Sequence, residues 1–378
     1  MIPCPTKIDR SVIINKFFFF VLALAGLALL AACGGAPPAT GWSGAALDQN
    51  SLYYGGGDAK IIALDPATGA KKWSYPQDKN LISVYGTPVV ENGTLYVGGY
   101  DGVFRALNAN SGTLRWQFPV EPNPAALGPV VPTALVANNT IYFGDNNNKF
   151  YALDAANGSK KWEFSAKDKI WSSAAFDKGT VYFGSLDHNL YALDAATGAK
   201  KWNYDASSLI AGTPLIANGT LYFGAQSKFV ALDAATGKLK WEFKSDNQNE
   251  WIWSKPTWRN DAVYFGTLAG KVYALNASTG SVVWSQSLSS NAEIRSAIVV
   301  EGDIGYFGAT DQYVYAIDLN NGALKWKIQL QGPVYASPTL QAGILYLPIQ
   351  GHNMYALNAA DGSRKWCFDA NSGQLCGN

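Results

Sequence analysis

Side chains of the kinds that most often carry catalysis are scarce in this sequence. Its 378 residues include two histidines, His188 and His352, and four cysteines. Each histidine stands in a short polar segment, Asp-His-Asn or Gly-His-Asn, of the kind that forms turns. The sequence contains neither a G-x-S-x-G nucleophile motif nor a C-x-x-C-H haem-attachment motif. We therefore predict no catalytic residue and no metal site.

One oxygen-rich segment, Asp145-Asn-Asn-Asn148, carries the carboxylate and amide groups that Ca²⁺ prefers. An aspartate occupies a similar segment elsewhere at Asp58, Asp101, Asp187 and Asp311. Because such side chains bond to nearby backbone N–H groups in turns, a turn explains all five segments without a metal ion. The formal net charge of +1 and the dispersed lysine pairs do not favour a polyanionic partner, and we expect no nucleic acid.

The residues that recur most regularly have structural types. A twelve-residue motif, represented by Tyr191-Ala-Leu-Asp-Ala-Ala-Thr-Gly-Ala-Lys-Lys-Trp202, occurs eight times with the same Ala, Gly and Trp. Its period of about 42 residues indicates a repeat architecture. A recurring large residue with a recurring small one predicts that the Trp of one unit packs over the Ala of the next. The predicted docking tryptophans are Trp73, Trp116, Trp162, Trp202, Trp241, Trp284, Trp326 and Trp366.

Each repeat unit is predicted to form four short strands, A to D. Apolar alternation runs into the Ala of the motif, as in Leu190-Tyr-Ala-Leu193, and the following Asp and Gly favour a turn before the Trp strand. Upstream, segments such as Ala217–Gly224 indicate a hairpin with an Asn-Gly turn. Eight such units predict an all-β, eight-bladed β-propeller over residues 42–370, with a solenoid as the alternative. Because the first and last units are complete, we expect the ring to close by face packing.

The motif A-L-[D/N]-x-x-x-G-x-x-x-W resembles the tryptophan-docking motif of pyrroloquinoline quinone (PQQ)-like, or quinoprotein-like, propeller repeats, and the resemblance covers residues 42–370. Quinoprotein alcohol dehydrogenases of this family add an adjacent Cys–Cys disulfide, a Ca²⁺ site and a catalytic Asp. This chain has no adjacent Cys pair and lacks the long insertions that build the quinone pocket. The resemblance therefore implies the fold, while PQQ with calcium is not favoured and we predict no cofactor.

One mouth of the propeller channel is the candidate binding region. Five of the eight units place an aromatic residue at the first position of strand A. The loop before the sixth unit adds an acid and an indole, and two cations follow in the sixth and seventh units. Such groups suit a sugar, a quinone or a peptide segment, and packing between blades is the alternative. The candidate mouth comprises Trp42, Tyr85, Trp171, Glu250, Trp251, Trp253, Lys255, Arg295 and Tyr335.

The N-terminus has the pattern of an export signal. A basic segment precedes a 14-residue apolar run, Phe17 to Leu30, which is typical of a signal-peptide core and short for a membrane span. The run leads into Leu-Ala-Ala-Cys33, which resembles the lipobox of bacterial lipoproteins. An ordinary signal peptide with an incidental Cys is the alternative. We predict a lipoprotein signal peptide over residues 1–32, lipidation of Cys33 and a flexible tether over residues 33–41.

The two remaining cysteines outside the signal, Cys367 and Cys376, lie beside or within a predicted C-terminal tail, residues 371–378. An exported chain meets an oxidising compartment, which favours a disulfide between them over two free thiols.

A lipobox followed by eight such blades resembles, in architecture, the BamB-type outer-membrane assembly lipoproteins. The resemblance implies a non-catalytic, monomeric scaffold for an envelope protein partner, with a role in outer-membrane protein assembly. We expect an exported protein anchored to a membrane by lipid, at the outer membrane and periplasm or at the cell surface. Two alternatives stay open: a PQQ-dependent oxidoreductase and a surface carbohydrate- or peptide-binding module.

Overall fold

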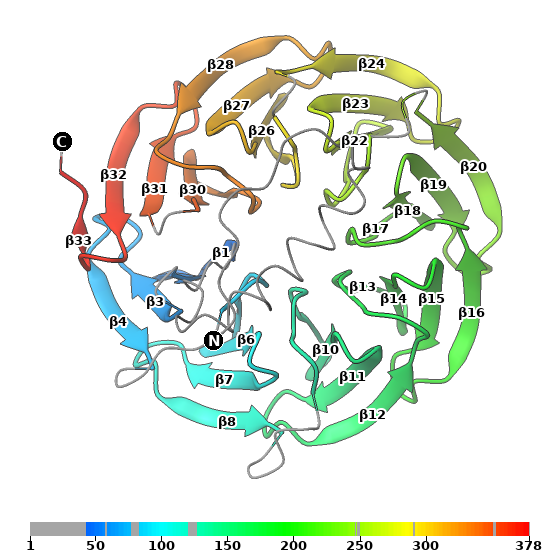
Figure 1. The fold of residues 1–378 in the computed structure, drawn as a ribbon, viewed down its shortest axis with the longest axis horizontal. Helices are drawn as coiled ribbons and strands as arrows, with labels where there is room; N and C mark the ends of the chain where they lie inside the picture. Colours follow the sequence, from blue (N-terminus) through cyan, green and yellow to red (C-terminus); the bar gives the residue numbers. More distant parts are fainter. Residues whose placement is uncertain are drawn as a thin grey trace, which may run out of the picture. The chain divides into compact units, whose positions relative to one another are not determined.

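The computed structural model describes residues 43–56, 59–76, 83–119, 127–245, 247, 250–289, 292–350 and 353–377. These residues form strands arranged as eight antiparallel sheets around a ring (Figure 1), which confirms the predicted eight-bladed all-β propeller. The described part of the chain contains no helix that is long and apolar enough to cross a membrane. The predicted signal peptide, Cys33 and the tether lie outside the described residues, as do Trp42 and His352.

The strands follow one another in chain order, with strands A to D of each blade hydrogen-bonded in sequence. Blades 1 to 4 comprise β1 (Ala45–Leu47), β2 (Leu52–Gly55), β3 (Ile61–Leu64), β4 (Lys71–Tyr75), β5 (Val89–Glu91), β6 (Thr94–Gly98), β7 (Phe104–Asn108), β8 (Leu114–Phe118), β9 (Leu135–Ala137), β10 (Thr140–Gly144), β11 (Lys149–Asp154), β12 (Lys160–Ser165), β13 (Ala175–Asp177), β14 (Thr180–Gly184), β15 (Asn189–Asp194) and β16 (Lys200–Asp205).

Blades 5 to 8 repeat the same arrangement, with one extra strand at the end of the chain. They comprise β17 (Leu215–Ala217), β18 (Thr220–Ala225), β19 (Lys228–Asp233), β20 (Leu239–Lys244), β21 (Thr257–Arg259), β22 (Ala262–Gly266), β23 (Lys271–Asn276), β24 (Val282–Ser287), β25 (Val299–Glu301), β26 (Ile304–Gly308), β27 (Tyr313–Asp318), β28 (Leu324–Gln329), β29 (Thr339–Gln341), β30 (Ile344–Pro348), β31 (Asn353–Asn358), β32 (Arg364–Asp369) and β33 (Gln374–Leu375).

The turns between strands A and B have the predicted hairpin geometry. Asn218 and Gly219 both have positive φ, 49° and 69°, and Asn92 and Gly93 repeat this pair at 47° and 68°. Two successive positive φ angles are typical of a type I′ turn, whose twist matches that of the flanking strands. Figure 1 shows the resulting order, with strands D such as β12 and β16 along the outer rim.

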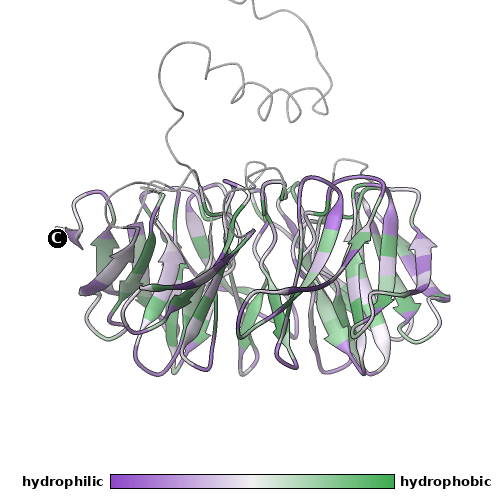
Figure 2. Cartoon of the chain, turned by 90° about the horizontal axis from the view of Figure 1, so that it is seen from below, coloured by the Kyte–Doolittle hydropathy of each residue, from purple (hydrophilic) through white to green (hydrophobic). Residues whose placement is uncertain are grey.

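The core lies between neighbouring blades, because both faces of each blade are covered by the next. Phe150 of blade 3 and Phe183 of blade 4 are fully buried and stack with ring centroids 3.9 Å apart. Phe229 and Phe265 repeat this contact between blades 5 and 6 at 4.2 Å. Figure 2 shows hydrophobic residues concentrated in the strands and hydrophilic ones in the loops at both ends. The apolar interior is therefore a ring of similar interfaces.

The docking tryptophans connect each blade to the next, but not through the predicted partner. Trp162 lies opposite Ala152 of its own blade, and its indole covers Gly198 of blade 4, where an added Cβ would lie 2.7 Å from the ring. The Trp162 Nε1 donates to the Ala195 carbonyl at 3.0 Å. The predicted packing over the next blade's Ala is therefore wrong in its partner residue, because the turn presents its glycine to the indole.

All eight docking tryptophans cover a glycine of the following blade, and each donates its indole N–H to a backbone carbonyl there. The covered glycines are Gly69, Gly112, Gly158, Gly198, Gly237, Gly280, Gly322 and Gly362. Each has a positive φ between 71° and 75°. Glycine is therefore required twice, by the backbone conformation and by the contact with the ring.

The ring closes as predicted, by face packing between two complete blades. Trp366 of blade 8 donates to the Pro66 carbonyl of blade 1 at 3.0 Å, and Thr339 Oγ1 donates to the Ala45 carbonyl at 2.6 Å. Cys367 and Cys376 form a disulfide, and β33, within the predicted tail, pairs with β32 as a fifth strand of blade 8. Neither blade borrows a strand from the other.

Candidate functional site

Backbone hydrogen bonds fix the loops that build the channel mouth. The loop between strand D of one blade and strand A of the next, the D–A loop, lies against B–C turns. In the loop before blade 4, the Ile170 N–H donates to the Asp145 carbonyl of blade 3 at 3.1 Å. The Leu186 N–H in the B–C turn of blade 4 donates back to Lys169 at 2.9 Å. The residues at the mouth therefore stand on loops tied to two blades.

Side-chain hydroxyls also join the first strands of neighbouring blades. The Thr87 N–H donates to Thr133 Oγ1 at 2.9 Å, and the Thr133 N–H donates to Ser173 Oγ at 2.9 Å. The Ala297 N–H makes the same bond to Ser337 Oγ at 2.8 Å. These bonds explain the small polar residues two positions after the mouth aromatics. They hold the inner strands at a fixed spacing, so the mouth side chains start from a rigid base.

Four predicted mouth residues form a continuous cluster, which we call the mouth cluster. Trp171 and Trp253 meet edge to face with ring centroids 6.2 Å apart. The Arg295 guanidinium lies 5.0 Å from the Trp253 ring and 5.2 Å from the ring of Tyr335. These residues come from blades 4, 6, 7 and 8, and blade 5 contributes only the small Ala211 at this position. The cluster therefore spans one sector of the mouth.

The charge within the mouth cluster is already compensated. The Arg295 Nη2 lies 2.8 Å from the carboxylate of Glu293, and the arginine side chain is only 13% exposed, compared with 42% for Glu293. A guanidinium held between two aromatic rings and a carboxylate is well oriented, since cation–π contacts and a charge-assisted hydrogen bond act on it together. The cluster is therefore suited to stacking and hydrogen bonding more than to attracting a free anion.

Lys255 supplies an exposed positive charge beside this cluster. It lies two residues after Trp253, is solvent-exposed, and makes no ion pair with another residue that the structure describes. The surrounding blades displace part of its hydration and lower the pKa of the ammonium group. This lysine is the mouth residue best placed to meet an acidic group of a ligand.

Glu250 and Trp251 have different surroundings. The buried Glu250 carboxylate accepts hydrogen bonds from the Tyr273 hydroxyl, at 2.6 Å, and from Ser245. The Trp251 carbonyl accepts the Leu268 N–H at 2.8 Å, and the Trp251 side chain is half-buried. Burial, followed by the bond to Glu250, raises the pKa of the Tyr273 hydroxyl. These contacts position the loop that carries Trp253, and Glu250 does not present its charge to the channel.

Tyr85 lies outside the mouth cluster. Its ring meets that of Tyr100 in the same blade at 5.1 Å, and burial raises the pKa of its hydroxyl. The predicted mouth residues are therefore divided: one group joins blades 4 to 8, and Tyr85 forms a local pair in blade 2.

The oxygen-rich segment acts as a turn. Asp145 is fully buried and accepts the N–H groups of Gly128, Asn147 and Lys149 at 2.8–2.9 Å. Burial raises the pKa of the Asp145 carboxyl, against the lowering effect of these bonds. His188 adopts a positive φ of 76° in the equivalent turn of blade 4. Within the described ranges, no group of three or more His, Cys, Asp or Glu side chains is arranged to hold a metal ion.

Two contributors to the site were absent from the sequence prediction. Asn146 accepts the Trp171 indole N–H at 2.8 Å and orients that ring. Glu293 binds Arg295 from two residues away. Asn146 belongs to a segment that the sequence explains as a turn, and only its neighbour in space reveals its second role. Glu293 stands where other units carry no acid, which is a signal visible in the repeat alignment.

Eight four-stranded blades, with a Trp from each docked on a glycine of the next, define a quinoprotein-like β-propeller. The family described as outer membrane protein assembly factor BamB matches residues 32–169, 162–301 and 292–376 in three overlapping segments. The chain belongs to this family, since the matches cover most of its length.

Solved structures confirm the fold. BamB from Moraxella catarrhalis superposes with a TM-score of 0.67 at 20% identity, covering 84% of this chain and 91% of that one. The computationally designed protein Ika8 gives 0.71 at 16% identity, covering 84% and 96%. Quinohemoprotein alcohol dehydrogenase from Comamonas testosteroni gives 0.67 at 14% identity, covering 86% and 73%. No curated protein sequence matches the chain significantly.

Proposed function

We propose that this protein is a non-catalytic scaffold of the cell envelope whose channel mouth binds a partner protein. The proposal is supported by membership of the BamB family and, above all, by the mouth cluster. Trp, Tyr and Arg are the residue types that most often dominate protein–protein binding energy. Here they are gathered from four separate blades on loops that hydrogen bonds hold in place.

The chemistry of the mouth indicates an extended polypeptide segment as its ligand. Trp253 and Tyr335 offer aromatic surface for a planar side chain. Because Glu293 already neutralises Arg295, the long-range attraction falls to Lys255, which favours an acidic residue near the stacked group. The partner segment we propose therefore carries a planar side chain next to an Asp or Glu.

The family name refers to outer-membrane protein assembly, and we propose that this chain takes part in that process. A monomeric propeller tethered near a membrane is suited to bringing one partner to a fixed place. Its rigid ring loses little conformational entropy on binding, which favours affinity from a small cluster of contacts.

We also propose that Cys33 carries lipid and forms the membrane anchor of the mature protein. The apolar run before it and the small residues beside it support this assignment. Replacement Cys33→Ser should move the protein from the membrane to the soluble fraction of the envelope, if acyl chains are its tether. Retention of the variant in washed membranes would contradict the proposal.

The binding proposal is tested by the double variant Trp253→Ala with Arg295→Ala. Tagged wild-type protein should retain a specific envelope protein in a pull-down, and the double variant should lose it. Loss of one such anchor residue often costs about 2 kcal/mol or more. Tyr85→Ala is the matched control, because it removes a mouth aromatic outside the cluster and should leave binding unchanged. Equal retention by the folded double variant would refute the assignment.

A further inference from the structure

One interface between blades lacks the side chain that fills the equivalent place in the others. The second residue after each docking Trp is aromatic in six blades and isoleucine in one, and only blade 6 has a polar residue there, Gln286. The equivalent residues are Tyr75, Phe118, Phe164, Tyr204, Phe243, Ile328 and Phe368. The departure therefore stands out against seven internal examples of the same position.

The role of this side chain is clear at the other interfaces. Phe164 of blade 3 packs on Tyr191 and Phe183 of blade 4, with ring centroids 5.1 and 6.2 Å away. Phe243 of blade 5 packs on Tyr273 of blade 6 at 5.2 Å. In each case the strand-D residue of one blade covers a strand-C tyrosine of the next. At the interface of blades 6 and 7 the tyrosine that awaits such a cover is Tyr315.

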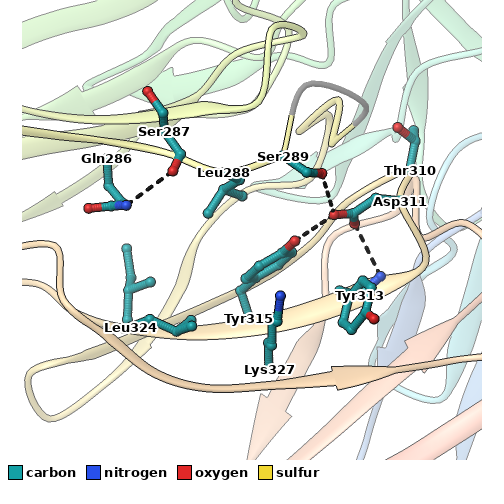
Figure 3. A pocket seen from close by; sticks show the side chains of 11 residues that line it. Gln286, Ser287, Leu288, Ser289, Thr310, Asp311, Tyr313, Tyr315, Leu324 and Lys327 are labelled. Atoms are coloured by element: carbon teal, nitrogen blue, oxygen red, sulfur yellow. Dashed lines mark hydrogen bonds between the residues drawn. The ribbon is translucent and has the colours of Figure 1, made fainter.

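Gln286 does not provide this cover. Its side chain is exposed, and its amide donates to the carbonyl of its neighbour Ser287 at 3.0 Å. A cavity of about 590 Å³ lies between blades 6 and 7, and Figure 3 shows Tyr315 at its centre. We call this cavity the interblade socket; it is lined by Gln286, Ser287, Leu288, Ser289, Thr310, Asp311, Tyr313, Tyr315, Ile317, Leu324 and Lys327.

The socket is apolar on one side and fixed by hydrogen bonds on the other. Leu288, Ile317 and Leu324 supply aliphatic surface, and Leu324 is 50% exposed. The Tyr315 hydroxyl and Ser289 Oγ both donate to Asp311, the latter at 3.0 Å (Figure 3). These bonds hold the Tyr315 ring in place, so the socket offers a flat aromatic surface bounded by aliphatic groups.

We propose that the interblade socket binds an aromatic side chain of a partner polypeptide, at the place that Phe243 and its equivalents fill in other blades. The repeats themselves define the occupant, because six of the seven equivalent residues are aromatic. Edge-to-face and offset packing on Tyr315 would reproduce the contact that Phe243 makes with Tyr273. This goes beyond the proposed function, since it adds a second binding surface outside the channel mouth.

The socket and the mouth cluster lie on the same face of the ring and share a connection. The Glu293 N–H donates to Thr310 Oγ1 at 3.0 Å, and the Thr310 N–H donates to the Glu293 carbonyl at 3.1 Å. Thr310 lines the socket, while Glu293 binds Arg295 in the mouth cluster. One polypeptide lying across blades 6 and 7 is therefore expected to reach both surfaces.

The test uses N-acetyl-tyrosinamide as the probe and N-acetyl-leucinamide as its aliphatic control. The full chain is labelled at Leu and Ile methyl groups and followed by NMR. A docked aromatic ring should shift the methyl signals of Leu288, Ile317 and Leu324 saturably, and the leucine amide should not. Shifts by both probes alike, or by neither, would overturn the proposal.

Filling the socket from within provides the decisive variant. Gln286→Phe should abolish the probe-induced shifts and raise the melting temperature, because the new ring covers Tyr315. Undiminished shifts in this variant would overturn the proposal; if it fails to fold, the smaller Gln286→Leu serves the same purpose. Phe243→Gln is the matched control, which should open an equivalent socket over Tyr273.

The mouth variant separates the two proposals. Trp253→Ala with Arg295→Ala leaves the socket intact, so the socket shifts should persist even when partner binding at the mouth is lost. A sugar probe, N-acetylglucosamine, should leave the methyl signals unchanged, and a saturable shift with it would overturn the assignment to a polypeptide side chain.

Discussion

The two faces of the ring differ in how strictly they repeat. On the face with the C–D turns, every blade makes nearly the same bonds: Asp194 accepts the Thr197 N–H at 3.1 Å, and Asn276 accepts the Thr279 N–H at 3.0 Å. On the D–A face, one position carries Trp253, then Arg295, then Tyr335 in successive blades. Repetition marks contacts that hold the ring together, and divergence marks the surface available for binding.

The largest effect on stability should come from the repeating contacts. Trp162→Ala removes a buried indole that covers Gly198 and bonds to Ala195, and it should lower the free energy of unfolding by roughly 3–5 kcal/mol. Urea denaturation measures this change. Trp253→Ala, on the divergent face, is the control and should cost less than about 1 kcal/mol. Equal costs would remove the distinction between the two faces.

The disulfide should have the next largest effect. Cys367 and Cys376 are nine residues apart and close a short loop, so replacing both with Ser should cost roughly 2–3 kcal/mol at most. The bond also fixes β33, whose Leu375 lies near Gly69 of blade 1. Denaturation with and without reductant measures the contribution. A wild-type protein whose stability is insensitive to reductant would show that this staple has little effect on ring closure.

The smallest expected difference isolates the docking contact itself. Gly198 and Gly179 have nearly the same φ, 73° and 72°, but an added Cβ would meet the Trp162 indole only at Gly198. Gly198→Ala should therefore destabilise the protein by about 1 kcal/mol more than Gly179→Ala. Thermal unfolding of the two variants gives this difference directly. Identical costs would mean that the backbone conformation alone requires glycine in the docking turn.

The fold was predictable from sequence because each unit repeats the same evidence. Eight copies of one motif establish the strands, the turns and the ring, and any single ambiguous segment is corrected by seven others. The docking partner was harder to predict. Ala152 and Gly198 are both small and both recur, and only the register of the strands shows that the indole lies opposite the first and covers the second.

The candidate site was predictable only in part, since it consists of departures from the repeat. Alignment of the units brought Trp253, Arg295 and Tyr335 to equivalent positions, and the structure joins them in one cluster. Glu250 stood in the same loop but turns into the protein toward Tyr273. Gln286 was visible as an exception in strand D, but the missing volume behind it depends on the blade that faces it.

The central claim is that a partner protein binds the D–A face at blades 6 to 8. The most direct measurement places the photo-crosslinking residue p-benzoylphenylalanine at Lys255 or at Ser278, both exposed in blade 6 but at opposite ends of its sheet. Irradiation of intact cells should give one envelope protein crosslinked from position 255 and none from position 278. A crosslink from position 278, with none from 255, would contradict the account and assign binding to the repetitive face.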